Sequence, residues 1–142
     1  MAKDDKLTIY HKTTQQMANL ASCPFCNIPS ERIIYQDRFW MAVKDQYPVS
    51  PGHVLMIPKE HFETYFDLPP QYAATLHVGT SIVKRMLEEE YHPDGWNLGC
   101  NCMEAGGQTV RHFHLHLIPR YNGDVDNPRG GVRGVIPSKQ NY

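Results

Sequence analysis

Three histidines alternate with apolar residues in the segment HFHLHLIPR, which occupies residues 112–120. Side chains two positions apart on a β-strand share one face, so His112, His114 and His116 are expected to point to the same side. Imidazole is a nucleophile and proton carrier near neutral pH, and it is also a common zinc ligand. The alternation therefore indicates either catalysis on an anion or a metal centre.

The segment EAGGQT, residues 104–109, comes directly before these histidines. Its glycines allow the backbone to approach a ligand closely and to direct N–H groups at it, as a phosphate site requires. The amide of Gln108 and the hydroxyl of Thr109 add hydrogen-bonding groups. A glycine pair alone is more often a simple turn, but beside three histidines it favours phosphate.

Four cysteines form two close pairs, Cys23 with Cys26 and Cys100 with Cys102. The start of the chain shows no secretory signal, so we expect metal ligands or free thiols before disulfides. The Cys-x-x-Cys spacing suits tetrahedral zinc but is weak evidence on its own. The second pair could complete an all-cysteine set with the first, so two ligand sets are open.

The composition excludes several classes of protein. The 142 residues carry 14 Lys and Arg against 15 Asp and Glu, a formal charge of −1, so nothing indicates nucleic-acid binding. The apolar runs are short and interrupted, so no membrane span is expected. With 41% hydrophobic residues the chain can bury a core, and we expect one cytoplasmic globular domain.

The elements that position these residues follow from periodicity and turn signals. Apolar residues at three- and four-residue steps predict an amphipathic helix from the prolines of DLPP to about residue 91. A short helix is expected near residues 12–20, and the Gly- and Pro-rich residues 121–142 are expected to form an extended, loosely structured tail. Hairpin-linked strands with one dominant helix predict an α+β fold with an antiparallel sheet. Five strands are expected, at residues 32–36, 39–44, 53–58, 95–101 and 109–119.

The segment AGGQTVRHFHLHLIPR, residues 105–120, resembles the signature of the histidine triad (HIT) superfamily. The upstream segment KDQYPVSPGHVLMIPKEH, residues 44–61, is similar to the family's Pro-Gly-His and Ile-Pro-Lys-x-His segment. The resemblance covers residues 22–120, which makes 1–21 an N-terminal arm and 121–142 a tail. It implies a single HIT-like domain with a five-stranded antiparallel sheet, one long helix and a short one, usually paired into a homodimer.

The resemblance also implies a chemistry. His114 would attack the α-phosphorus of a nucleotide, and water would hydrolyse the nucleotidyl-histidine, which splits one difficult step into two easier ones. His112 and His116 complete the triad, and His53 would orient it from behind. The positions that match substrate contacts in the family are Asp45 at the ribose, His116 and Gln108 at the phosphate, Thr109 near the leaving group, Asn101 at the substrate, and Phe25 and Ile28 at the base. Gly107, in the motif before the histidines, is also expected to bind substrate. Asp45 could equally be a loop-capping carboxylate.

The implied function is that of a nucleotide hydrolase acting on a purine nucleotide or a dinucleoside polyphosphate. Dinucleoside polyphosphates are the favoured substrate, since Arg129 and Arg133 of the tail could fold over the site and meet a polyanionic leaving group. The two arginines could equally be solvated. Phosphoramidate hydrolysis, nucleotidyl transfer or phosphorolysis, and a nucleotide-binding regulatory role are the alternatives.

The resemblance also bears on the cysteines. Some members of the superfamily complete a zinc site with two histidines that match His61 and His112. This favours Cys23, Cys26, His61 and His112 over the all-cysteine set. A site with four protein ligands leaves no open position for water, so the expected zinc is structural.

Overall fold

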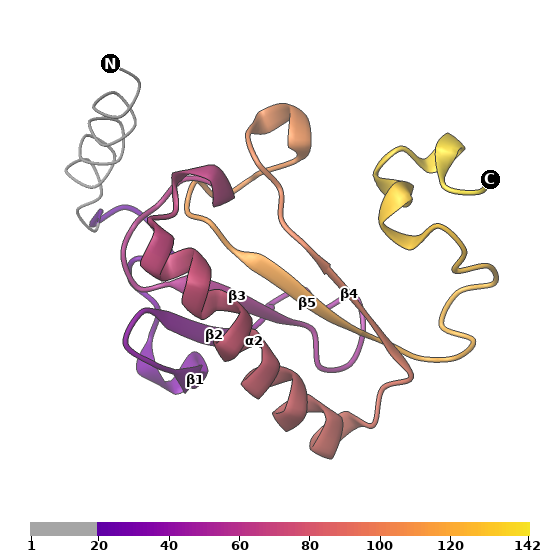
Figure 1. Cartoon of the computed structure of the whole chain (residues 1–142), viewed down its shortest axis with the longest axis horizontal. Helices are drawn as coiled ribbons and strands as arrows, with labels where there is room; N and C mark the ends of the chain where they lie inside the picture. The colour runs from indigo at the N-terminus through magenta and orange to yellow at the C-terminus, as the bar shows by residue number, and fades with distance from the viewer. Residues whose placement is uncertain (1–19) are drawn as a thin grey trace.

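A computed structural model describes residues 20–142 as a five-stranded antiparallel sheet with one long helix across one face (Figure 1). The strands are β1 (Ile33–Gln36), β2 (Trp40–Lys44), β3 (Val54–Pro58), β4 (Gly95–Gly99) and β5 (Leu115–Arg120), in the spatial order β1-β2-β3-β5-β4. The helix, α2, spans Pro70–Tyr91. The predicted α+β fold is thereby confirmed. The short helix expected near residues 12–20 lies outside the described residues, and the division into arm, domain and tail stays a prediction.

Helix α2 begins and ends where local chemistry requires. Pro70 stands at its first position, where a missing N–H costs nothing, and His92 after it takes a left-handed conformation with φ of 54°. The helix buries one stripe of side chains against the sheet: Tyr72, Leu76, Gly79, Thr80, Val83 and Leu87. None of the helices in the described part of the chain is long and apolar enough to cross a membrane.

The core between α2 and the sheet is centred on Trp40 and Phe113, which are 0% and 1% exposed. The Trp40 indole Nε1–H donates to the Tyr72 carbonyl at 3.1 Å and to the Thr75 hydroxyl at 3.0 Å, which fixes the start of the helix on β2. A second apolar cluster covers the opposite face of the sheet and consists of Met41, Val43, Leu55 and Ile57. The sheet is therefore buried on both faces across β2 and β3.

Strand β5 starts at Leu115, six residues later than predicted, so His112 and His114 lie in irregular backbone before it. The reason is the end of its neighbour, β3. Pro58 has no N–H to extend the ladder, and its carbonyl accepts a hydrogen bond from the His112 imidazole at 2.9 Å. The Phe113 N–H donates instead to the carbonyl of Phe62, outside the sheet, at 2.6 Å. Strand β4 likewise ends at Gly99 and not at residue 101.

The tail is folded, and the prediction of a loose, extended arm was wrong. It forms 3₁₀ helices at Gly131–Val135 and Pro137–Lys139 and lies on the β4 side of the sheet (Figure 1). The guanidinium groups of Arg129 and Arg133 lie 4.9 and 4.7 Å from the ring centre of Tyr142. These contacts with the last residue hold the end of the tail together.

Candidate functional site

One face of β5 packs in the core, and the other face carries the residues of the candidate site. Phe113 and Leu117 belong to the core under α2, whereas His116 follows the opposite face, paired with Leu55 of β3 and Gly99 of β4. Phe25 and Ile28 pack against the apolar cluster of that same face. His116 and the residues expected at the base are therefore brought to one face of the sheet.

His114 is held in a single orientation and a single tautomer. Its Nδ1 lies 2.9 Å from the carbonyl oxygen of His112. A carbonyl only accepts hydrogen bonds, so Nδ1 carries the proton and Nε2 presents its lone pair. The ring is 8% exposed and meets the ring of Phe25 edge-on at 5.0 Å. The backbone thus leaves the lone pair of His114 on Nε2.

A chain of hydrogen bonds fixes His116 as the opposite tautomer to that of His114. The Val49 N–H donates to Nδ1 of His53 at 3.1 Å, which leaves the proton of neutral His53 on Nε2. That Nε2 lies 2.9 Å from Nδ1 of His116. His116 therefore accepts at Nδ1 and carries its own proton on Nε2, where it can donate to a ligand.

Burial keeps both of these imidazoles neutral. It lowers the pKa of His116 to about 4, with the neighbouring histidines adding to the effect. It also lowers the pKa of His53, against a smaller opposing effect of the Asp45 carboxylate. The hydrogen-bonded tautomers of His53 and His116 are therefore the forms present at neutral pH.

Asp45 sits at the end of this chain. Its Oδ1 accepts the Tyr47 N–H at 2.8 Å, so the residue caps its own loop, one of the two roles that the sequence left open. Its Oδ2 lies 3.4 Å from Nε2 of His53 and 3.9 Å from Nδ1 of His116. These three side chains could also hold a metal ion, but 2.9 Å between the two imidazole nitrogens is a hydrogen-bond distance. We therefore interpret the group as a hydrogen-bonded chain.

Gln108 does not reach the histidines in this structure. Its Nε2 donates to the carbonyls of Glu63 and Val110 at 2.6 and 3.0 Å, and its Oε1 accepts the Met103 N–H at 2.9 Å. The residue thus binds three backbone groups and holds the loop before the histidines. Both Met103 and Gly107 take positive φ there, 66° and 91°, and the Met103 conformation is one that side chains rarely adopt.

The other predicted substrate contacts border the same region. Asn101 lies beside Gly107, where an added Cβ would come within 3.9 Å of its side chain. Thr109 is exposed. A cavity of about 310 Å³ extends from His116 and Asn101 along β4, and its outer wall is the tail at Gly131, Val132 and Val135. The sequence raised the possibility that the tail reaches the site through Arg129 and Arg133, but the tail residues that line this cavity are Gly131, Val132 and Val135.

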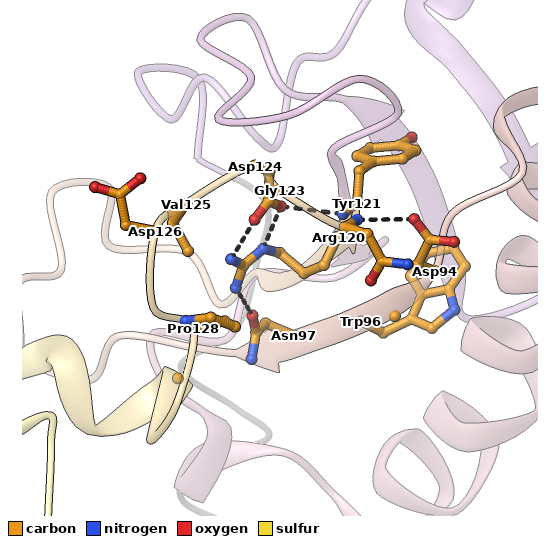
Figure 2. Close-up of a pocket in the computed structure, with 13 residues that line it drawn as sticks. Asp94, Trp96, Asn97, Arg120, Tyr121, Gly123, Asp124, Val125, Asp126 and Pro128 are labelled. Carbon is orange, nitrogen blue, oxygen red and sulfur yellow. Dashed lines mark hydrogen bonds and ion pairs between the residues drawn. The ribbon is translucent and has the colours of Figure 1, made fainter.

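The start of the tail is tied to the ends of β4 and β5, as Figure 2 shows. The Arg120 guanidinium donates to both Asp124 oxygens at 2.7 and 2.8 Å and to Asn97 at 2.6 Å. The Asn122 N–H donates to Asp94 at 2.8 Å. Two cavities of about 400 and 540 Å³ lie between these strand ends and residues 121–131. The tail is therefore anchored before it reaches the wall of the smaller cavity.

Cys23, Cys26, His61 and His112 form a four-residue cluster whose ligand atoms all lie within 4.8 Å of one another. The His112 Nδ1 is 3.4 Å from Sγ of Cys23 and 3.5 Å from Sγ of Cys26, and the His61 Nδ1 is 3.3 Å from Sγ of Cys26. Sulfur and nitrogen ligands of a tetrahedral zinc lie roughly 3.5 Å apart, for Zn–S of about 2.3 Å and Zn–N of about 2.0–2.1 Å. The donor set and spacing fit zinc.

Two further features prepare this cluster for a metal. The Nε2 of His112 faces the Pro58 carbonyl, so the proton sits there and Nδ1 is left as the ligand atom. The Leu20 N–H points at Sγ of Cys26 at 3.4 Å, and the Asn27 amide nitrogen reaches three carbonyls of the same turn. Among residues 20–142, no cluster of three or more potential ligands includes Cys100 or Cys102, so the rival all-cysteine set is not assembled.

Comparison with known proteins gives one family and several informative relatives. The HIT domain matches residues 27–123. Adenylylsulfatase HINT3 of Arabidopsis thaliana is 33% identical over 107 residues, 72% of this chain and 54% of that protein. AP-4-A phosphorylase of Mycobacterium tuberculosis is 30% identical over 109 residues, 72% of this chain and 56% of that protein. A zinc-bound histidine triad family protein from Mycobacterium smegmatis superposes with a TM-score of 0.66 and 38% identity, covering 72% of this chain and 78% of that one.

Proposed function

The chain belongs to the HIT domain family, and from that premise we propose that it hydrolyses nucleoside 5′-phosphoryl compounds through a nucleotidyl-histidine on His114. The observation that carries the proposal is the hydrogen bond from Nδ1 of His114 to the His112 carbonyl, 2.9 Å long. It places the proton on Nδ1 of this buried ring and leaves the lone pair on Nε2. Such a group needs no activation by a base before it attacks phosphorus.

In the first step the Nε2 lone pair of His114 forms a bond to the α-phosphorus, and the leaving group departs with the electron pair of the broken bond. Negative charge develops on the phosphoryl oxygens. The Nε2–H of His116 is the donor placed to stabilise that charge, because its Nδ1 is engaged by His53. In the second step water attacks the phosphorus and releases a proton to solvent, and the bond to His114 breaks, with its electron pair returning to Nε2 to regenerate the imidazole.

The remaining predicted residues are assigned to binding. Phe25 and Ile28 would hold the base against the apolar cluster, and Asp45 would accept hydrogen bonds from the ribose through Oδ2. Asn101, Thr109 and the Gly107 backbone would border the phosphate. Gln108 would keep the loop in shape, because its three hydrogen bonds all go to backbone groups.

A structural zinc would hold the start of the triad in place. The proposed ligands are Cys23, Cys26, His61 and His112, and a zinc with four protein ligands supplies stability instead of a reactive water. His112 is the link to catalysis, since its side chain would bind the metal while its carbonyl holds His114. The zinc-bound relative supports the assignment.

A homodimer is part of the proposal. The face of α2 turned away from the sheet exposes Val78, Ile82 and Met86, which recur at four-residue steps and are 57%, 41% and 39% exposed. An exposed apolar stripe of this kind is typical of a subunit contact, and two-fold pairing is the commonest arrangement.

The candidate substrates differ in the leaving group attached to the nucleoside 5′-phosphoryl group. Dinucleoside polyphosphates were favoured because of Arg129 and Arg133, but these guanidinium groups stack on Tyr142 and do not line the cavity beside His116. A relative named AP-4-A phosphorylase keeps dinucleoside polyphosphates, and phosphate as the acceptor, among the candidates. A relative named adenylylsulfatase adds nucleoside phosphosulfates.

Turnover of a small panel tests the proposal. Purified protein is incubated with diadenosine tetraphosphate, adenosine 5′-phosphoramidate and adenosine 5′-phosphosulfate, with and without inorganic phosphate. We expect AMP from at least one substrate without phosphate, and a loss of at least ~10³-fold in kcat for His114→Asn. Product that forms only with inorganic phosphate would establish phosphorolysis. Equal rates for the variant and the wild type would reject the nucleophile.

A further inference from the structure

We propose that the cavity between His116 and the tail is the leaving-group subsite and that it selects leaving groups of apolar character. The proposal rests on the function above. We call the inner face of Gly131, Val132 and Val135 the tail wall. The tail wall is thus a specificity-determining part of the protein.

The position of the cavity follows from the strand order. Strand β5 carries His116 and lies between β3 and β4. The proposed base site around Phe25 lies on the β3 side of His114, with the two rings 5.0 Å apart. The cavity lies on the β4 side, and the rings of His114 and His116 are 5.2 Å apart. A substrate bound across β5 therefore places its nucleoside on one side and its leaving group in the cavity.

The lining of the cavity is apolar or neutral. Its apolar residues on the His116 side are Ile118, Val132 and Val135, because Leu98 pairs with Leu117 and so directs its side chain to the other face of the sheet. None of the ten described residues that line it is an Asp, Glu, Lys or Arg. Burial also holds its titratable groups neutral, lowering the pKa of His116 to about 4 and raising that of Cys100 to about 11. A polyphosphate placed here would lose water and find no cation in return.

Two of the apolar side chains of the cavity are exposed. Val132 and Val135 of the tail wall are 60% and 77% exposed. An apolar occupant would remove this surface from water, which is the driving force for binding it. A charged occupant would lose its own hydration against this apolar surface without gaining a partner.

The tail wall is held in place from both ends. The bidentate pair of Arg120 with Asp124 anchors the chain before it (Figure 2). After it, the Arg133 guanidinium donates to the Lys139 carbonyl at 3.0 Å and stacks on Tyr142. The cations that could have served a polyanionic leaving group are used to build the tail, and valines face the cavity instead.

The test measures binding to the full chain carrying His114→Asn, which cannot turn the ligands over. The probes are AMP and two adenosine 5′-phosphoramidates, one of n-hexylamine and one of 6-aminohexanoate. The two amides share the nucleotide, the P–N bond and the chain length, and differ in a methyl against a carboxylate end. By calorimetry the hexylamide should bind at least about tenfold more tightly than the carboxylate, because the carboxylate would lose its water in the cavity without gaining a cation.

Two further substitutions in the same background locate the effect. Val135→Asp should abolish the preference. Val125→Asp places the same charge on an exposed tail valine that borders only the neighbouring cavities, so it should retain the preference. Light scattering on both variants accompanies the titrations.

Each other outcome overturns the inference. Equal affinities for the two amides, with AMP bound, would reject the subsite and leave the proposed function intact. Loss of the preference in both valine variants would do the same. A Val135→Asp protein that loses its preference only because it dissociates into monomers would assign the tail wall to a subunit contact. Failure of AMP itself to bind would reject the proposed function, and the inference with it.

Discussion

Replacing Cys26 by Ser removes one of four proposed zinc ligands and little else. The Cys26 Sγ lies 3.3 Å from Nδ1 of His61 and 3.5 Å from Nδ1 of His112, so it faces the middle of the cluster. A hydroxyl is a poor substitute for a thiolate as a zinc ligand. We expect about one zinc per chain in the wild type and almost none in the variant. Cys102→Ser is the matched control, because Cys102 lies outside the cluster.

The effect on stability can be worked from mass action. A metal at 1,000 times its Kd stabilises the folded state by about 4 kcal/mol, and one kcal/mol shifts the Tm of a chain of this size by roughly 3 °C. The variant should therefore melt about 10 °C lower.

Elemental analysis and calorimetry provide the assay. A chelator should lower the Tm of the wild type to that of Cys26→Ser and leave the Tm of the variant unchanged. Zinc retained in Cys26→Ser, or lost in Cys102→Ser, would refute the assignment of the ligands. If the Tm of the wild type changes neither with added zinc nor with the chelator, the structural role of the zinc is refuted.

Three more predictions concern pH, packing and assembly. The pKa of His116 falls from 6.5 to about 4 on folding, so between these values the unfolded chain binds more protons. Stability measured by urea unfolding should therefore fall as pH drops from 6.5 to 4, and less so in His116→Asn; equal slopes would refute the buried neutral imidazole. Phe113→Ala should cost about 3–5 kcal/mol, whereas Phe66→Ala, at 80% exposure, should cost about 0.5 kcal/mol or less in the same measurement. Light scattering should find a dimer at micromolar concentration that Ile82→Glu dissociates; a wild-type monomer would exclude the proposed contact.

The strands and the helix were predictable because their patterns are local. Helix α2 was expected from about residue 70 to 91 and spans Pro70–Tyr91, and β2 and β3 start within one residue of their predicted positions. Apolar periodicity and proline signals depend only on neighbours in the sequence. The start of β5 was missed because it depends on Pro58, a residue more than fifty positions away.

Some features of the candidate site were likewise predictable from the sequence and others were not. Residue types and the family resemblance identified the histidines and the four cluster ligands. They could not identify what sets the imidazole tautomers, since the partners are backbone groups of Val49, Pro58 and His112, and any residue type supplies these. The place of Arg129 and Arg133 was also not predictable, because it depends on a stacking contact with Tyr142 that leaves no periodic signal.

Trapping the covalent intermediate tests the central claim most directly. The protein is mixed with the substrate that it cleaves fastest, denatured within milliseconds at alkaline pH because P–N bonds hydrolyse in acid, and mapped by peptide mass spectrometry. The account predicts one nucleotidyl group per chain on the peptide that contains His114, and none in His114→Asn. Turnover without an adduct, or an adduct on His112 or His116, would contradict it.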